Sequence, residues 1–285
     1  MLTDAVNTLP VVKIIAHDRA DTYDLLAAEE PLEIRVEFGK QGQREVRNIA
    51  VTMRTPGNDA ELARGFLFTE GVVKNASDIA SIQHCFIACA ENKENVVQVI
   101  FKEGITPELK NTERNFYTTS SCGVCGKGSI SAIRSSVSYT LGNDHNCISA
   151  STLYKLTDIL NSHQEVFAET GGLHASALFT TDGKLLLVRE DVGRHNALDK
   201  LIGAAVELGM VPLTEHVLLL SGRASFELVQ KAAMAGINII AAIGAPSTLA
   251  VQMAEEFGIT LIGFLRNQRF NIYTGPHRIL TSVKL

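Results

Sequence analysis

The most unusual segment of the chain is TTSSCGVCGKGS at residues 118–129, which places Cys122 and Cys125 among small and flexible residues. The segment leads into a predicted helix, and the first turn of a helix offers free N–H groups and partial positive charge that stabilise a thiolate. Lys127 adds a cation nearby, and small neighbours leave both sulfurs accessible. This pattern is typical of a nucleophilic thiol that accepts sulfur as a persulfide and passes it on, while the second cysteine resolves, shuttles or shares that sulfur.

Other interpretations of the cysteine pair stay open. A structural zinc site needs about four ligands, so Cys85 and Cys89, or the same pair of a second subunit, would have to complete it. A thioredoxin-like redox pair normally follows a buried strand, and residues 115–121 are too polar for one. Inert cysteines in a loop are the third alternative. Cys85, Cys89 and Cys147 are expected to be small buried or incidental residues rather than catalytic ones.

A second group of polar side chains lies in EDVGRHNALDK, residues 190–200, between a predicted strand and a predicted helix. Arg194 and His195 fall at the apex of the connecting loop, from which side chains reach a ligand. The alternative is a capped helix start, with Asn196 as the N-cap and Asp199 and Lys200 simply solvated.

Three successive predicted strands in the last third end in Arg or Ser side chains. They end in Ser221, Gly222 and Arg223, then in APST at 245–248, and then in Phe264, Leu265, Arg266, Asn267, Gln268 and Arg269. Ligands bind at this edge of open α/β sheets, where a helix N-terminus holds a phosphate. The pattern predicts a site for an anionic, phosphorylated ligand, although neither a P-loop nor a dinucleotide-binding glycine motif is present. His174 is expected to be a hydrogen-bonded structural histidine, with a ligand-facing role as the alternative.

The elements that position these residues form two predicted domains after an N-terminal arm. Residues 1–30 are predicted to be a disordered or loosely packed arm. Residues 31–115 are predicted to form a small α+β roll, with strands at 33–38, 47–53, 82–87 and 96–101 and a helix that begins with a capping box of Asn58 and Glu61.

Residues 116–285 are predicted to form an α/β sandwich. Helices are expected near 130–137, from 153 until Gly171 and Gly172, and from about Asn196, with a hairpin turning at Asp182-Gly183. A β-α-β-α-β run then covers residues 216–264. Its strands are continuously apolar, which is typical of a parallel sheet with helices on both faces.

Composition excludes several classes of protein. The net charge of −5, without a Lys/Arg run, argues against a nucleic-acid binder. The first thirty residues lack the pattern of a signal peptide, and no stretch reaches the roughly 18 apolar residues of a membrane span. Five cysteines, an odd number, indicate a reducing compartment, so a cytoplasmic location is expected.

Seven motifs together resemble proteins of the FdhD family, over roughly residues 30 to 275. Their number and order carry the resemblance, since any one of them would be modest evidence. In chain order they are MRTPGND (53–59), ARGFLFTEG (63–71), SSCGVCG (120–126), TGGLHA (170–175), EDVGRHNALDK (190–200), SGRASFE (221–227) and GFLR (263–266).

The resemblance implies a cytidine-deaminase-like three-layer α/β second domain and a homodimer. It implies a sulfurtransferase that carries sulfur from a cysteine desulfurase to the bis-guanine-dinucleotide molybdenum cofactor required by formate dehydrogenase. Cys122 is then the persulfide-bearing residue, Cys125 its partner, and 264–269 part of the cofactor site. Four arginines are expected to neutralise the phosphates of the cofactor, namely Arg194, Arg223, Arg266 and Arg269.

GDP-like nucleotides are candidate ligands of the same site, and no metal of the protein's own is expected. The deaminase zinc signature is missing, because the segment around His174 lacks the glutamate and the CxxC lacks the preceding proline.

Two other functions stay open at the level of sequence. One is a non-catalytic chaperone or scaffold that binds the cofactor or the dehydrogenase, with the cysteines structural or bound to zinc, which metal analysis would detect. The other is a nucleotide-binding thiol oxidoreductase, which requires a reversible Cys122–Cys125 disulfide that a redox titration would detect.

Overall fold

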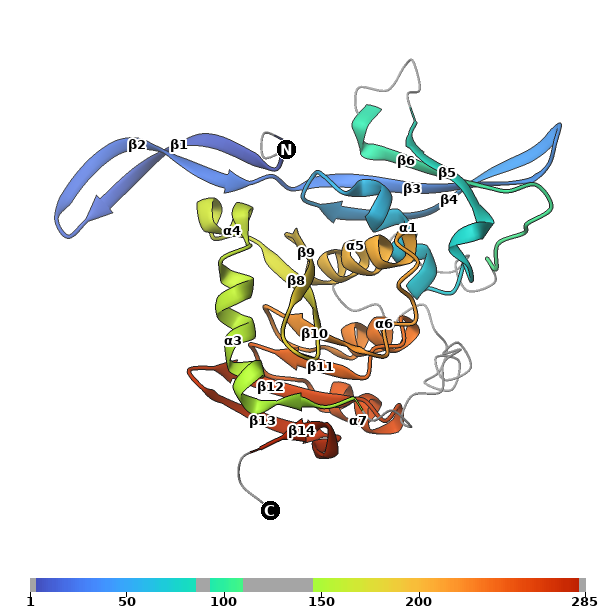
Figure 1. Cartoon of the computed structure of the whole chain (residues 1–285). Helices are drawn as coiled ribbons and strands as arrows, with labels where there is room; N and C mark the ends of the chain where they lie inside the picture. Colours follow the sequence, from blue (N-terminus) through green and yellow to red (C-terminus); the bar gives the residue numbers. More distant parts are fainter. Residues whose placement is uncertain (1–3, 86–92, 110–145, 282–285) are drawn as a thin grey trace.

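Two sheets of different kinds organise the chain, and the computed structural model describes residues 4–85, 93–109 and 146–281. A four-stranded sheet with one helix lies at the top of the view in Figure 1, and a six-stranded sheet with helices on both faces lies below it. The predicted fold class, a small α+β unit followed by a three-layer α/β unit, is confirmed. The domain boundaries at residues 30 and 115 stay predictions, and residue 115 lies outside the described residues.

The smaller sheet has the strand order β4-β3-β6-β5. Leu32, Ile34 and Val36 alternate along one strand and are fully buried, because this face of the sheet is covered by a helix. The alternation therefore predicted the correct face. The elements are β3 (Glu30–Lys40), β4 (Gln43–Arg54), α1 (Asp59–Thr69), β5 (Ile79–His84) and β6 (Val96–Phe101).

The larger sheet has the order β13-β12-β11-β10-β8-β9, with β10, β11 and β12 parallel and the outer strands antiparallel. Its strands are β8 (His174–Thr180), β9 (Leu185–Asp191), β10 (His216–Leu220), β11 (Ile239–Ala242), β12 (Thr260–Arg266) and β13 (Arg269–Thr274). The predicted hairpin and β-α-β-α-β run are both present. The sheet is mixed rather than wholly parallel.

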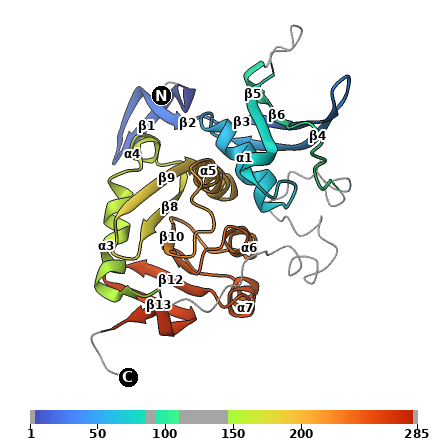
Figure 2. The ribbon, with the colours of Figure 1, turned by 45° about the vertical axis from the view of Figure 1, so that its right-hand side comes forward.

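Helices cover both faces of this sheet, as Figure 2 shows from a second direction. Leu218 and Leu220 of β10 pack with one helical layer, whereas Val217 and Leu219 of the same strand pack with the other. The first layer is α5 (Arg194–Glu207), α6 (Phe226–Met234) and α7 (Thr248–Glu256), and the second contains α3 (Ala150–Asn161) beside the short pair β7 (Ile148–Ser149) and β14 (Ile279–Leu280). Among the described residues, no helix is long and apolar enough to cross a membrane.

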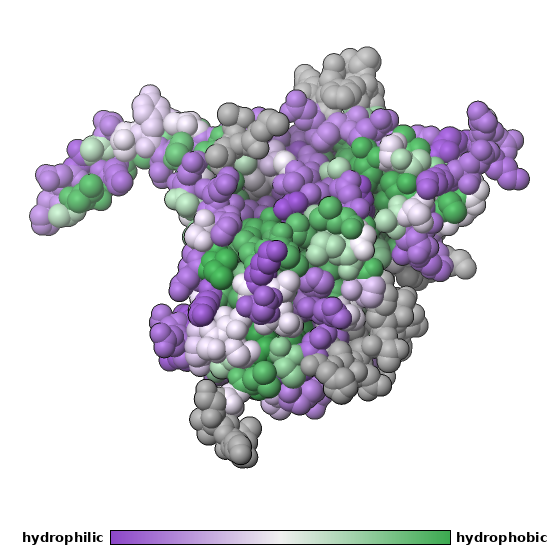
Figure 3. Space-filling view, in the orientation of Figure 1, coloured by the Kyte–Doolittle hydropathy of each residue, from purple (hydrophilic) through white to green (hydrophobic). Residues whose placement is uncertain are grey.

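The N-terminal arm is an ordered β-hairpin, which contradicts the disordered alternative, whereas its exposure along both strands agrees with a loosely packed arm. Strands β1 (Val6–Ile15) and β2 (Asp18–Ala27) pair antiparallel along their whole length. In the space-filling view of Figure 3 the hairpin projects away from the body, with hydrophilic and hydrophobic residues mixed on the visible face. Val12, Ile14 and Tyr23 are more than half exposed. No burial alternation marked these strands, because nearly every residue in them is exposed.

Several helix ends differ from the sequence prediction. Asn58 precedes α1 with φ of 57°, and in this left-handed conformation its side chain makes no cap bond, so the predicted capping box is wrong. Gly193, not Asn196, is the N-cap of α5. The helix predicted to run from residue 153 to Gly171 is two helices, α3 and α4 (Glu165–Thr170), and only the second ends at that glycine. The helix predicted near 130–137 lies outside the described residues.

The two units are joined by direct backbone contact between α1 and α5. A Cβ atom at Gly65 would lie 1.9 Å from the backbone oxygen of Asp199, and one at Gly203 would lie 1.9 Å from the backbone oxygen of Glu61. No side chain fits at either position, so the two glycines permit the helices to cross at this distance.

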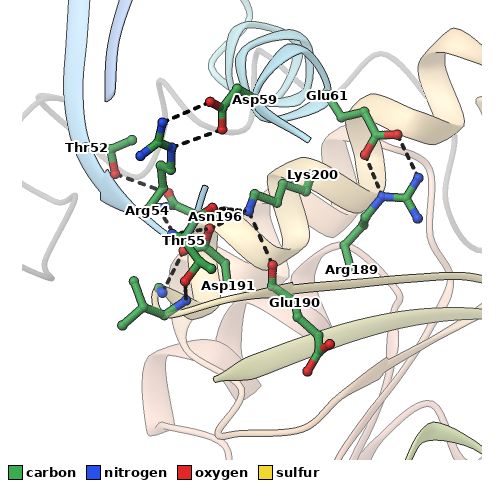
Figure 4. A network of polar contacts seen from close by, with 12 residues as sticks. Thr52, Arg54, Thr55, Asp59, Glu61, Arg189, Glu190, Asp191, Asn196 and Lys200 are labelled. Carbon is green, nitrogen blue, oxygen red and sulfur yellow. Dashed lines mark hydrogen bonds and ion pairs between the residues drawn. The ribbon is translucent and has the colours of Figure 1, made fainter. Parts of the chain in front are cut away.

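Buried charged residues of α5 lie at this junction, and Figure 4 shows the contacts of one of them, Lys200. Lys200 Nζ lies 2.7 Å from Asp191 Oδ2 and donates to Thr55 O at 2.8 Å. Asp199 accepts from Lys231 Nζ at 2.9 Å. Asp199 and Lys200 are each 1% exposed, so the expectation that they are solvated is wrong. Their partners come from other elements, and a buried charge without such a partner would be costly.

Candidate functional site

The carboxyl ends of β10, β11 and β12 meet at one edge of the larger sheet because these strands run parallel. Helices α6 and α7 begin at this edge after β10 and β11, and α5 begins there after β9. Each helix start offers N–H groups without an intrahelical partner and a partial positive charge. The edge therefore favours an anionic ligand, and it carries the strand ends that the sequence singled out.

Backbone hydrogen bonds hold the strand ends together. Gly222 O accepts from Gly244 N at 2.9 Å, and Gly244 O accepts from Phe264 N at 3.1 Å. Ser221 Oγ is also fixed, since it accepts from a backbone N–H of β8 at 2.8 Å. Arg223 is exposed at the same edge and Phe264 is half-buried. These four candidate residues, Ser221, Gly222, Arg223 and Phe264, are thus brought close together by the sheet.

The remaining residues of the 264–269 segment form the tip of the β12–β13 hairpin. Asn267 and Gln268 have φ of 52° and 54°, the left-handed pair that a two-residue type I′ turn requires. Arg266 and Arg269 are paired across this turn and both are exposed. Like charges in directly opposite positions repel, so an anion between them would be stabilising. The Leu265 side chain is 1% exposed and packs in the core instead.

His195 forms a polar cluster with two residues at the start of α6. His195 Nε2 lies 2.7 Å from Glu227 Oε2 and 3.3 Å from Ser225 Oγ. Both contacts use the same ring nitrogen, so the cluster is not a catalytic triad, in which serine and carboxylate bind opposite nitrogens. Ser225 and Glu227 are not among the site residues predicted from the sequence. Their position within the SGRASFE motif is the signal that could have identified them.

His174, the first residue of β8, lies beside the end of β10. A Cβ atom at Gly222 would be 3.3 Å from His174 Nδ1. His174 also lines a cavity of about 430 Å³ with Ser221 and with Gln164, a buried amide that the sequence did not mark. Burial lowers the pKa of His174, and the neighbouring charges of Arg194 and His195 lower it further. The cavity wall therefore contains a histidine that resists protonation.

The structure thus places ten of the eleven predicted non-cysteine residues at one edge, as strand ends, as the start of α5 or as the tip of the β12–β13 hairpin. The exception is Leu265, which packs in the core. Arg194, Arg223, Arg266 and Arg269 supply positive charge along this edge, and the helix starts supply N–H donors. Guanidinium groups and helix N-termini are the usual ligands of protein-bound phosphates, so these residues fit a phosphorylated ligand.

The predicted catalytic pair, Cys122 and Cys125, lies outside the described residues, as does Cys89. Of the described cysteines, Cys85 bonds through its Sγ to the Gln98 side chain at 3.4 Å. Over residues 4–85, 93–109 and 146–281, no group of three His, Cys, Asp or Glu side chains is arranged to hold a metal ion.

The fold and the candidate site define a mixed α/β protein with a row of arginines and helix starts at one sheet edge. The model of the FdhD/NarQ family matches residues 27–280, and the chain therefore belongs to this family, as its motifs predict. A protein named "Sulfur carrier protein FdhD" from Mycolicibacterium paratuberculosis is 53% identical over 260 residues, which span 90% of this chain and 92% of that protein.

More distant relatives agree with this assignment. A protein of the same name from Sulfurisphaera tokodaii is 42% identical, over 96% of this chain and 99% of its own length. The crystal structure of a putative formate dehydrogenase accessory protein from Desulfotalea psychrophila has a similar fold, with a TM-score of 0.73 over 97% of this chain and 100% of that one. Its sequence identity of 24% supports the fold alone.

Proposed function

We propose that this chain is a sulfurtransferase that carries sulfur as a persulfide on Cys122, with Cys125 as its partner, and delivers it to the molybdenum cofactor of formate dehydrogenase. The observation that carries the proposal is the 53% identity, over 90% of the chain, with a protein named as a sulfur carrier. The CGVCG segment adds the chemistry, since a thiolate among small residues next to a lysine is an accessible nucleophile.

The substrate we propose is the bis-guanine-dinucleotide form of the cofactor. Its diphosphate groups are anionic, and the described edge presents Arg194, His195, Arg223, Arg266 and Arg269 together with helix starts. Charge-assisted hydrogen bonds from guanidinium groups to phosphates are among the stronger polar contacts in proteins. A GDP-like nucleotide has the same diphosphate and serves as a simpler ligand of this site.

The partners we propose follow from this role. A cysteine desulfurase supplies the sulfur, formate dehydrogenase receives the sulfurated cofactor, and the chain acts in the cytoplasm as a homodimer. The persulfide step balances without an added oxidant, because transfer of a sulfane sulfur from the desulfurase persulfide to the Cys122 thiolate returns the donor cysteine as a thiolate.

Restoration of activity in a living host tests the function. Expression of the wild-type chain is expected to restore formate dehydrogenase activity to bacteria whose own member of the family has been deleted. The measurement is formate-dependent dye reduction in cell extracts, with the level of dehydrogenase protein measured in parallel. Normal dehydrogenase protein without restored activity, despite good expression of this chain, would contradict the proposal.

The nucleotide site is tested separately by binding. Replacing both Arg266 and Arg269 with alanine is expected to weaken GDP binding by about tenfold or more, because each charged hydrogen bond contributes about 1.5–3 kcal/mol. Isothermal titration calorimetry measures the effect at fixed salt concentration. Arg19→Ala, an exposed arginine of the N-terminal hairpin, is the control and is expected to bind GDP like the wild type. Equal affinities of the wild type and both variants for GDP would show that the hairpin tip does not contribute to the nucleotide site.

A further inference from the structure

The ionisable groups around His174 pair with one another. The Asp191 carboxylate of β9, which is opposite His174 in the sheet, lies 2.7 Å from Lys200 Nζ. The His195 imidazole of α5 lies 2.7 Å from the Glu227 carboxylate of α6. Each of these charges has its counterion close by, which reduces its effect on His174.

The arginines at this edge are not compensated in the same way. Arg194 Nε is buried and has no hydrogen-bond partner among the described residues. Arg223, directly after Gly222, is exposed. The α3–α4 segment adds Asn161, Gln164 and Phe167, all uncharged, to the cavity beside His174. The Glu190 carboxylate of β9 accepts from the backbone N–H groups of Val166 and Phe167 at the start of α4. The buried guanidinium nitrogen of Arg194, near His174, therefore has an unused donor.

We infer that His174 couples the binding of an anionic ligand at this edge to the uptake of a proton. A phosphate group held by Arg194, Arg223 and the helix starts lies beside the His174 imidazole, and its negative charge favours the imidazolium form. Protonation converts a ring nitrogen from an acceptor into a donor, so the charged His174 then binds the anion directly. The inference rests on the proposed function, because it takes the ligand to be the phosphorylated cofactor or a nucleotide like it.

The direction of the pH effect follows from the two states of His174. Without ligand, burial and the nearby cations keep its pKa below the ordinary value of 6.5. The anion raises that pKa in the complex, so the complex binds a proton that the free protein does not. Affinity therefore increases as the pH falls through the pKa of the complex, by up to about tenfold per pH unit. The affinity becomes constant once the pH is below the pKa of His174 in the free protein.

Calorimetry with GDP-mannose tests the coupling. The diphosphate of this probe is esterified at both ends, so the probe itself does not titrate near neutral pH. Binding enthalpies measured at about pH 6.5 in two buffers of different ionisation enthalpy give the number of protons taken up per ligand. The wild type is expected to take up a measurable fraction of a proton, up to about one. His174→Gln is expected to lose most of this uptake while still binding the probe.

The control is His277→Gln, which changes an exposed histidine outside the site and is expected to keep the wild-type uptake. Unchanged uptake in His174→Gln, or no uptake by the wild type despite binding, overturns the inference and leaves the proposed function intact. Failure of the wild type to bind GDP-mannose overturns both the nucleotide site and this inference. If His174→Gln does not fold, the coupling is tested instead on the wild type, by following the ¹³Cε1 chemical shift of His174 with NMR. A shift toward the protonated position on adding the probe at constant pH supports the coupling, and no shift overturns it.

Discussion

Replacing Cys122 with alanine is expected to abolish the formate dehydrogenase activity that the wild-type chain restores to a deficient host. The persulfide can form only on a thiolate, and alanine removes the sulfur that would carry it. No other group in the chain offers the same combination of small neighbours, an adjacent lysine and a second cysteine two residues away. The activity is measured in cell extracts, relative to the amount of dehydrogenase protein.

The matched control is Cys147→Ala. Cys147 is a half-buried free cysteine whose Sγ lies 3.8 Å from the backbone oxygen of His277, away from the CxxC segment in sequence. Its replacement is expected to leave the restored activity close to that of the wild type. The unfolding midpoints of both variants are measured in urea, so that loss of activity is separated from loss of folding. A fully active Cys122→Ala protein would contradict the carrier role.

The largest effect on stability is expected from Gly65→Ala. The added Cβ would lie 1.9 Å from the backbone oxygen of Asp199, a distance that only separation of α1 and α5 relieves. Overpacking of a well-packed core costs about 1–3 kcal/mol and occasionally more, and a clash with backbone belongs at the upper end. In an ordinary helix the same change would be stabilising, by about 0.5–1 kcal/mol, because alanine is the better helix former.

Thermal unfolding followed by circular dichroism measures this effect. For 285 residues, a loss of about 3 kcal/mol corresponds to a midpoint roughly 5 °C lower, because the unfolding entropy is about 2.1 cal/mol/K per residue. Gly172→Ala is the matched control, since its new Cβ would be 3.5 Å from the nearest atom, an ordinary contact. It is expected to unfold close to the wild type. A Gly65→Ala protein as stable as this control would show that α1 and α5 do not depend on the glycine contact.

Local patterns predicted most of the fold. The alternation of Ile34, Val36 and Phe38 identified the buried face of β3, and the continuous apolar runs identified β10, β11 and β12. The N-terminal hairpin was not predicted, because strands exposed on both faces have no burial periodicity to detect. The start of α1 was predicted, but its cap was not, since the left-handed φ of Asn58 is not visible in a capping-box pattern.

The predicted ligand edge depends on a general property of parallel sheets, so it could be proposed without coordinates. The roles of the individual residues within EDVGRHNALDK could not be predicted from the sequence. Asn196 Nδ2 donates to Met53 O at 2.7 Å and Lys200 Nζ donates to Thr55 O at 2.8 Å, contacts that join residues more than a hundred positions apart. A charged or amide residue near a helix start is usually solvated or a cap, and only these distant partners make burial favourable here.

The most direct test of the carrier role is intact-protein mass spectrometry after incubation with a cysteine desulfurase and cysteine. Wild type, Cys122→Ala and Cys125→Ala are compared without reductant. The account predicts an increase of about 32 Da on the wild type, the mass of one sulfur atom, that is absent from Cys122→Ala. An unmodified wild type whose cysteines still react with an alkylating agent, or an adduct that persists on Cys122→Ala, would contradict it.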